Sequence, residues 1–429
     1  MLMDPSTITL IKIRAMKNMR RKVYMVAGYN TIAMGSGRKE FNPKKERPGL
    51  EELMKEAGQA TLKMIGGAQN IDECVVGNFM ASRFNHQANL AAFFPFIDAG
   101  LKYKPATRVE GACCSGGLAL MNGIKSVLAE TAEVVLVLGV EVQNTVKAIY
   151  GADILAGAGW YKQRKNGHAF FFPGQFSNRA GAYYEKYGRS NTMNAFAQWY
   201  HNAIENARLC PTAQEYHNTL PDLKACALTE PNGRSFVDHL NGFCCSKVSD
   251  GASCIAVVSE EGLQRVGIPK SEAVEIIGWG HAIDDITKTA EDLAELATTR
   301  QAISMALNNA GITIDQVGTA EVHDCFTIAG VMAVEALGLA EKGKGAEYII
   351  EGNTALTGKF PINTTGGLIG WGHPTGATGV HQAITILEQL TGKAGANQIA
   401  ISPERPYGLT VNMGGDDKTL VSIIYKRGE

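Results

Sequence analysis

The pattern of apolar and polar positions along the chain predicts alternating strands and helices. Residues 133–140 form a nearly continuous apolar run, which is typical of a strand buried on both faces. Residues 50–65 place apolar side chains at helical spacing and leave charged ones on the opposite face. The same two patterns predict strands at 23–28, 75–79, 249–258 and 319–322, and helices at 118–129, 192–207 and 380–390. The chain is therefore expected to be an α/β protein.

The second half of the chain repeats the first. The segment 302–322 echoes 60–79, and the turn and strand at 414–424 echo the strand at 249–258. Two copies of one α/β unit predict two layered halves packed about a pseudo-twofold axis. The stretch between them, 144–245, is irregular, polar and rich in aromatic residues. A plain loop of that length is improbable, so we interpret it as an inserted subdomain.

These patterns divide the chain into four parts. We expect an N-terminal extension at 1–21, a first half at 22–143 plus 246–268, the inserted subdomain at 144–245, and a second half at 269–429. The extension carries five basic residues, but Asp4 and its short apolar stretch fit a transit peptide poorly.

The composition excludes several classes of protein. The 429 residues are 45% apolar and 19% charged, as in soluble globular proteins. A net charge of -1 gives no reason to expect nucleic acid or a membrane surface as partner, and no apolar run is long enough to span a membrane. The nine cysteines lack disulfide or zinc spacing, and the nine histidines form no metal-binding pair. We expect reduced thiols, no bound metal and a cytoplasmic location.

Cys113 lies where an extended stretch breaks into a helix start of small residues. Unpaired backbone N–H groups and the positive end of the helix dipole favour a thiolate at such a position. The Ser-Gly-Gly that begins two residues later would let a ligand approach the backbone closely. An isolated cysteine is more often a small buried side chain, so the other reactive segments decide the interpretation.

Three further segments carry candidate chemistry. His323 and Cys325 lie just beyond a short strand, His373 lies in a glycine-dense turn before a helix, and Asn412 precedes the glycine turn before the last strand. Each alone is compatible with a structural role, such as a hydrogen-bonded core histidine. Their symmetric placement in a duplicated α/β frame favours one shared catalytic site.

From about Lys22 onward the chain resembles a thiolase. The resemblance rests on Cys-x-Ser-Gly at 113–116, Ser-Asp-Gly-Ala at 249–252 and Gly-His-Pro-Thr-Gly-Ala-Thr-Gly at 372–379. His-Asp-Cys-Phe at 323–326 stands where degradative thiolases usually have Asn-Glu-Ala-Phe, and Asn-Met-Gly at 412–414 replaces their second catalytic cysteine. In both motifs the chain resembles the sterol-carrier-protein type branch of the family instead. The resemblance implies the thiolase fold: two duplicated βαβαβαββ halves in a layered α/β/α arrangement.

The resemblance also implies roles for individual residues. Cys113 would be the nucleophile and His373 its activating base. Cys325 would replace the missing second cysteine as acid/base, and His323 would stabilise the oxyanion or enolate. Backbone N–H groups of Cys113 and Gly414 would hold the tetrahedral oxyanion. The residues implied to contact substrate are Asn412, Met413, Trp371 and Phe326.

The implied reaction is the CoA-dependent cleavage of a 3-oxoacyl-CoA, or the reverse Claisen condensation. Coenzyme A would be a co-substrate, with no permanently bound cofactor. A ketosynthase-like condensing enzyme remains an alternative, although it would have no need of Cys325. A hydroxymethylglutaryl-CoA synthase would want a glutamate base. A non-catalytic acyl-CoA-binding scaffold is disfavoured because Cys113 and His373 are both present.

Substrate and partner remain open at this level. Aromatic residues at 160–161 and 170–172 could line a pocket for an aryl or long acyl group, or could belong to the core. Benzoylsuccinyl-CoA and acetoacetyl-CoA are both candidates. Bacterial and archaeal relatives in this branch often pair with a small OB-fold, zinc-ribbon subunit, which implies a heteromeric complex built on a homodimer. Cys114, Cys244 and Cys245 are expected to be structural.

Overall fold

A computed structural model describes residues 21–429, apart from the side chains of 165 and 166. The extension expected at 1–21 therefore lies almost entirely outside the described residues. Within the described part, no helix is both long enough and apolar enough to cross a membrane.

Nine strands form one mixed sheet in the order β3-β2-β4-β5-β1-β6-β9-β8-β7. The strands are β1 (Tyr24–Asn30), β2 (Glu73–Gly77), β3 (Ala106–Val109), β4 (Val134–Glu141), β5 (Gly251–Val258), β6 (Val274–Ile283), β7 (Val317–Glu321), β8 (Tyr407–Gly414) and β9 (Thr419–Arg427). Strand β4 is buried throughout, as its apolar run predicts. Asn412 and Met413, which precede the predicted glycine turn, belong to strand β8 and pair along β9.

The sheet shows the predicted duplication. In the first half β3, β2 and β4 are parallel, and β5 and β1 follow antiparallel. In the second half β7 and β8 are parallel, and β9 and β6 follow antiparallel; a bridge between Ala320 and Ile362 takes the place of β3. The halves meet through a short antiparallel contact of β1 with β6 at Met25 and Val274.

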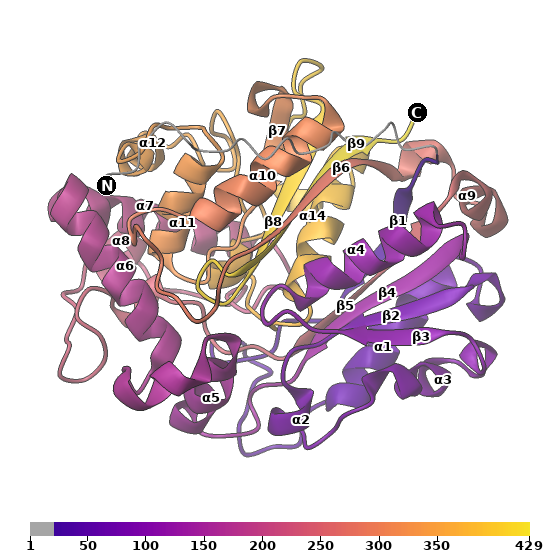
Figure 1. The fold of residues 1–429 in the computed structure, drawn as a ribbon, viewed down its shortest axis with the longest axis horizontal. Helices are drawn as coiled ribbons and strands as arrows, with labels where there is room; N and C mark the ends of the chain where they lie inside the picture. Colours follow the sequence, from indigo (N-terminus) through magenta and orange to yellow (C-terminus); the bar gives the residue numbers. More distant parts are fainter. Residues whose placement is uncertain (1–20) are drawn as a thin grey trace, which may run out of the picture.

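The α-helices that cover this sheet fall in three layers (Figure 1). Helices α4 (Ser115–Leu128) and α14 (Thr378–Thr391) pack on each other between the two halves and share one hydrophobic core with both. Helices α1 (Leu50–Met64) and α3 (Phe94–Ile97) cover the outer face of the first half. The outer face of the second half is covered by α10 (Ala297–Ala310) and α11 (Thr327–Ala336). This is the predicted layered α/β arrangement of two duplicated halves.

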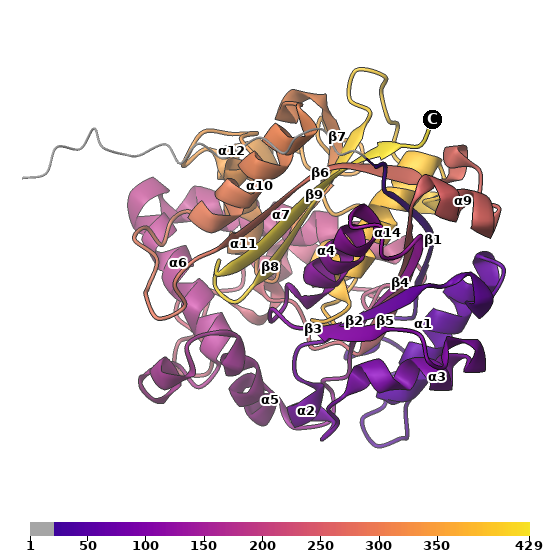
Figure 2. The same cartoon turned by 45° about the vertical axis from the view of Figure 1, so that its right-hand side comes forward.

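The remaining helices are α2 (Ala81–Phe84), α5 (Ala148–Leu155), α6 (Phe171–Tyr187), α7 (Arg189–Arg208), α8 (Leu223–Ala227), α9 (Glu260–Val266), α12 (Gly345–Ile350) and α13 (Gly367–Gly370). Helices α5 and α6 lie on the left of the molecule in Figures 1 and 2. The stretch 144–245 is thus largely helical rather than irregular. The buried face of α6 carries aromatic side chains such as Phe176 and Tyr183. The sequence therefore shows no aliphatic period from which this helix could be predicted.

Candidate active site

Cys113 lies in a tight turn between β3 and α4. The preceding residue, Ala112, has a φ of 55°, an uncommon conformation for a residue with a side chain. The amides of Cys114 and Ser115 donate to the carbonyls of Gly111 and Ala112 at 3.0 and 3.1 Å. Strained backbone of this kind often marks a functional turn, and here it holds the thiol at the wall of a cavity.

The glycines after Cys113 serve helix packing. A Cβ atom on Gly116 would lie 2.8 Å from the amide nitrogen of Gly379 and 3.0 Å from the carbonyl oxygen of Gly376. Glycine is therefore required where the N-terminal ends of α4 and α14 meet. The sequence predicts that these glycines let a ligand approach the backbone. Instead, they allow α14, the helix that follows the His373 turn, to pack closely against α4.

Cys113, His323 and His373 form the centre of the site. One sulfur or nitrogen atom from each lies within 4.8 Å of the others, and the two imidazole rings are nearly perpendicular with centroids 5.0 Å apart. Cys113 comes from the first repeat, whereas His323 follows β7 and His373 precedes α14 in the second. Among the described residues, this is also the group whose spacing would allow a metal ion to bind.

A cavity of about 220 Å³ opens onto this group. Cys325 lines it together with the three central residues. The rest of the lining is mainly apolar and comes largely from α5, α6 and neighbouring loops; its larger members are Phe79, Leu155, Phe170, Phe172, Phe176, Phe236 and Phe326. The cavity thus joins a small reactive end to a wide aromatic wall.

The hydrogen bonds of His373 identify its free nitrogen. Thr378 donates its hydroxyl proton to the carbonyl of Pro374 at 3.1 Å, so its oxygen can accept from Nδ1 of His373, 2.7 Å away. The proton is then on Nδ1, and Nε2 carries a lone pair. That Nε2 is buried without a protein partner. His373 is therefore set up to accept a proton.

His323 carries the opposite tautomer. The amide oxygen of Asn412 accepts from the backbone N–H of Gly117 at 3.0 Å, which turns its NH₂ toward the carbonyl of Cys113 at 3.2 Å and Nδ1 of His323 at 3.4 Å. An NH₂ group can only donate, so Nδ1 accepts and the ring proton is on Nε2. His323 can therefore donate a hydrogen bond.

Burial keeps the central groups neutral. It raises the pKa of Cys113 to about 12, with the nearby charge of Glu141 adding to the effect. It also lowers the pKa of His373 to about 3 and that of His323 well below its usual value. The sequence predicts a thiolate at the helix start; desolvation outweighs the helix dipole here, and the resting site is a thiol beside two neutral imidazoles.

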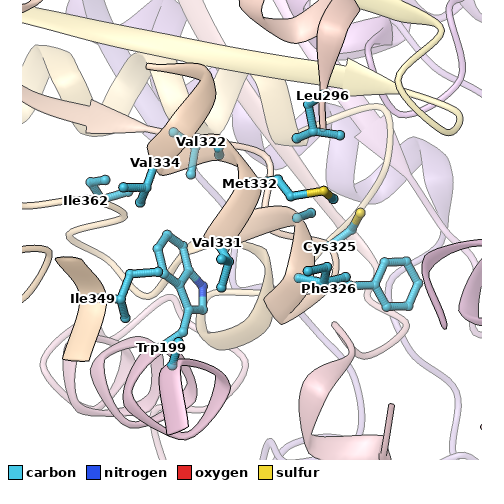
Figure 3. Close-up of a cluster of buried hydrophobic side chains, with 14 of the residues drawn as sticks. Trp199, Leu296, Val322, Cys325, Phe326, Val331, Met332, Val334, Ile349 and Ile362 are labelled. Atoms are coloured by element: carbon cyan, nitrogen blue, oxygen red, sulfur yellow. The ribbon is translucent and has the colours of Figure 1, made fainter. Parts of the chain in front are cut away.

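The other predicted residues fall into two groups. Cys325 and Phe326 line the cavity and belong to a buried hydrophobic cluster with Met332 (Figure 3). Burial raises the pKa of Cys325 well above its usual value. Trp371 is fully buried against His381, with ring centroids 3.5 Å apart, and lies outside the cavity lining.

Met413 is also buried in the core of the second half and does not line the cavity. Strand residues alternate sides, so Asn412 reaches the site and Met413 points away from it. Cys114 and Cys244 are packed in hydrophobic clusters, as expected. Cys245, in contrast, lines the cavity.

Two residues of the site escaped the sequence analysis. Gly415 lines the cavity, and its backbone N–H acts on the Cys113 thiol so as to lower the thiol's pKa; the neighbouring Gly414 packs against Gly111. Fully buried Glu141 accepts from the amides of Phe79 and Met80 and from Thr375 and Gly376, at 2.8 to 3.1 Å. The sequence does contain a signal for Glu141, because a charged residue directly follows the apolar run at 133–140.

Comparison with known proteins agrees with this geometry. Residues 24–172 match the family model of the thiolase N-terminal domain, and 280–427 match that of the thiolase C-terminal domain-like family. An acetyl-CoA acetyltransferase of Methanocaldococcus jannaschii is 32% identical over 395 residues, covering 90% of this chain and 96% of the relative. That of Methanothermobacter thermautotrophicus is 31% identical over 382 residues, covering 88% and 94%. Human sterol carrier protein 2 is 27% identical over 410 residues, covering 89% and 70%.

Two solved structures share the fold. The Ltp2-ChsH2(DUF35) aldolase superposes with a TM-score of 0.74 at 19% identity, covering 95% of this chain and 98% of that one. Human mitochondrial 3-ketoacyl-CoA thiolase in complex with CoA gives 0.68 at 18% identity, covering 96% and 100%. Fold, site and relatives define the chain as an acyltransferase enzyme. It belongs to the thiolase family, in the sterol-carrier-protein type branch.

Proposed function

We propose that the chain cleaves a 3-oxoacyl-CoA with coenzyme A, or runs the reverse Claisen condensation, through an acyl group on Cys113. The observation that carries the proposal is the group of Cys113, His323 and His373 at the end of an apolar cavity. Coenzyme A is the co-substrate, and no permanently bound cofactor is needed.

The first step is attack of Cys113 on the keto carbon. The thiol proton passes to Nε2 of His373, which holds a lone pair and no other partner. A carbon–sulfur bond forms, and the keto oxygen becomes an oxyanion. Backbone N–H groups of Cys113 and of the turn at Gly414 and Gly415 hold this charge.

The second step breaks the carbon–carbon bond and leaves a thioester enolate. His323 donates its Nε2 proton as a hydrogen bond to the enolate oxygen, a role that its tautomer allows. Cys325 gives its thiol proton to the enolate carbon. Its raised pKa keeps that proton in place until the enolate forms. Free coenzyme A then attacks the acyl-Cys113 thioester and gives its thiol proton to the Cys325 thiolate, while Cys113 leaves and takes back the proton held by His373.

The acyl group is aromatic, as in benzoylsuccinyl-CoA, rather than the acetyl group of acetoacetyl-CoA. Five phenylalanines line the cavity outside the reactive end: Phe79, Phe170, Phe172, Phe176 and Phe236. Phe170 and Phe236 meet edge to face with centroids 5.4 Å apart, an arrangement that a planar ring can extend. Of the aromatic residues predicted at 160–161 and 170–172, only Phe170 and Phe172 reach the lining. We retain Asn412 and Phe326 as proposed substrate contacts; support comes from the hydrogen bond of Asn412 to the carbonyl of Cys113 and from Phe326 in the cavity lining.

The assembly that we propose is a homodimer that pairs with a small OB-fold subunit carrying a zinc ribbon. Support comes from the Ltp2-ChsH2(DUF35) aldolase, which has this fold and whose name includes a DUF35 component. We also propose the division of the chain into two halves, 22–143 plus 246–268 and 269–429, with 144–245 as the inserted subdomain.

The test is a thiolysis assay with benzoylsuccinyl-CoA and acetoacetyl-CoA, with and without any subunit that co-purifies. The native enzyme should form an acyl group on Cys113, visible by mass spectrometry, and prefer the aromatic substrate. Cys113→Ser should abolish both acylation and turnover, while Cys114→Ser, which changes the neighbouring packed thiol, should retain them. Unchanged thiolysis by Cys113→Ser would refute the mechanism, and a preference for acetoacetyl-CoA would refute the substrate.

A further inference from the structure

We propose that Arg179 is a positioning residue that holds the turn after β8 against Cys113. Arg179 belongs to α6, in the inserted part of the chain, yet its side chain is completely buried. It forms an ion pair with Asp416, the residue that follows Gly415. The inserted part thereby contacts the turn whose N–H faces the nucleophile. This inference rests on the proposed function.

The contacts of Arg179 fix it in one place. Nε bonds to the carboxylate of Asp416, and Nη1 donates to the carbonyls of Leu293 and Glu295 at 3.2 and 2.8 Å. A buried guanidinium is costly unless it is paired and hydrogen-bonded; replacing both members of a buried ion pair by apolar side chains is often neutral for stability, whereas removing one member alone is destabilising. A positioning role toward Asp416 therefore explains the buried charge of Arg179 better than a contribution to the stability of the fold does.

The far side of the same turn has separate anchors. Asp417 accepts from the amides of Thr298 and Thr299 at 2.9 Å each, at the start of α10. Lys418 pairs with Asp284. These contacts begin two residues after Gly415, so Arg179 is the side chain that holds the residue next to it.

The backbone at Gly415 is tightly packed, so the position of its peptide is closely fixed. Its φ is 69°, and a Cβ atom there would lie 2.7 Å from the carbonyl of Ala158. The peptide is thus confined between Cys113 and the inserted part of the chain. Small displacements of an oxyanion donor cost rate because the donor must meet charge that develops only in the transition state.

Arg179 also offsets a negative charge that acts on Cys325. The carboxylate of Asp416 contributes to the raised pKa of Cys325. With Arg179 removed, Asp416 would be an unpaired, partly buried anion near Cys325. The pair therefore serves both the oxyanion turn and the proposed proton donor.

The experiment compares Arg179→Met, Arg179→Lys, Asp416→Asn and the double variant Arg179→Met/Asp416→Asn. Loss of a single oxyanion donor lowers kcat by about 100-fold, so Arg179→Met should lose up to about that factor with KM unchanged. Lysine retains the charge and should recover part of the rate. Because the two residues act as one pair, the double variant should be no slower than the slower single variant. Arg189→Met is the matched control, since Arg189, the first residue of the next helix, α7, makes an exposed ion pair with Glu230.

Unchanged kcat in Arg179→Met, a rise in KM alone, or additive losses in the double variant would each overturn the proposal. Should Arg179→Met fail to fold in a thermal melt, Asp416→Asn and Arg179→Lys decide by the same criteria. Absence of acylated Cys113 in the native enzyme would instead refute the proposed function. The rate of Cys113 alkylation by iodoacetamide, expected to be slower in Arg179→Met, tests the positioning role even then.

Discussion

Two histidines of the same site hold opposite tautomers because of one hydroxyl and one amide. Thr378 fixes the proton of His373 on Nδ1, and Asn412 fixes that of His323 on Nε2. The sequence motifs identify both histidines, and Thr378 is itself part of a motif. The orientation of Asn412 depends on Gly117 in the other half of the chain, so no local pattern could predict it.

Cys325 and Cys245 share the cavity, yet only Cys325 has a proposed role. Cys325→Ala should lower kcat for thiolysis by about 100- to 10,000-fold, because a positioned acid supplies that much. Acylation of Cys113 by a simple acyl-CoA should continue at the native rate, since it needs only Cys113 and His373. Steady-state assays and mass spectrometry of the acyl-enzyme measure the two steps separately.

The control for this variant is Cys245→Ala, which removes a thiol of equal size from the same cavity and should leave both steps unchanged. Equal loss in the two variants would mean that the cavity tolerates no change of volume, and Cys325 would have no special role. Loss of acylation in Cys325→Ala would also contradict the division of labour between the two thiols.

At the scale of elements, the site depends on the contact between α4 and α14. The sequence predicts both helices from apolar periodicity, and helices with such a period are the parts of the fold that a local pattern encodes. It does not predict that Gly116 meets Gly376 and Gly379, because that contact joins residues far apart along the chain. The sequence analysis also does not predict helix α6, because aromatic rather than aliphatic side chains mark its buried face.

Gly116→Ala tests this contact. The new Cβ would lie 2.8 Å from the amide nitrogen of Gly379 in α14, and backbone cannot move aside as a side chain can. Overpacking of this kind costs about 1–3 kcal/mol, and the melting temperature should fall together with kcat. Gly151→Ala is the matched helical control, since its Cβ would meet nothing closer than 3.8 Å.

We expect Gly151→Ala to keep its activity and to gain up to about 1 kcal/mol, because alanine loses less backbone entropy on folding. Thermal unfolding and thiolysis assays of both variants check the pair. A Gly116→Ala enzyme as stable and active as the native one would show that α14 does not constrain the start of α4.

At the scale of the whole molecule, duplication is the feature that the sequence conveys best. The echo of 60–79 in 302–322 predicts two halves, and the sheet order shows them related about β1 and β6. The division of labour between halves is also apparent, with the nucleophile in one and the histidines in the other. The shape of the cavity could not be predicted, because its wall joins residues of α5 and α6 to residues that lie far away along the chain, such as Phe79 and Phe326.

The two ends of the sheet differ, and the difference predicts how two copies associate. The edge of β7 is covered by the bridge to Ile362, whereas β3 pairs only with β2 among the strands of the described chain. The carbonyls of Pro105 and Val109 accept from β2, so alternation turns the backbone groups of Ala106 and Arg108 outward. An open strand edge is a template for pairing with a second chain.

The protein should therefore be a dimer of twice the 46.0 kDa chain mass by light scattering, with slow hydrogen exchange at the amides of Ala106 and Arg108. Ala106→Pro removes an outward N–H while an edge strand can accept proline, so it should release folded monomers. Arg108 also donates to Asn78 and to the carbonyl of Phe79 on the cavity wall at 2.8 and 3.0 Å, so the monomer should bind substrate more weakly. Rapid exchange at both amides in a dimeric protein would place the interface elsewhere.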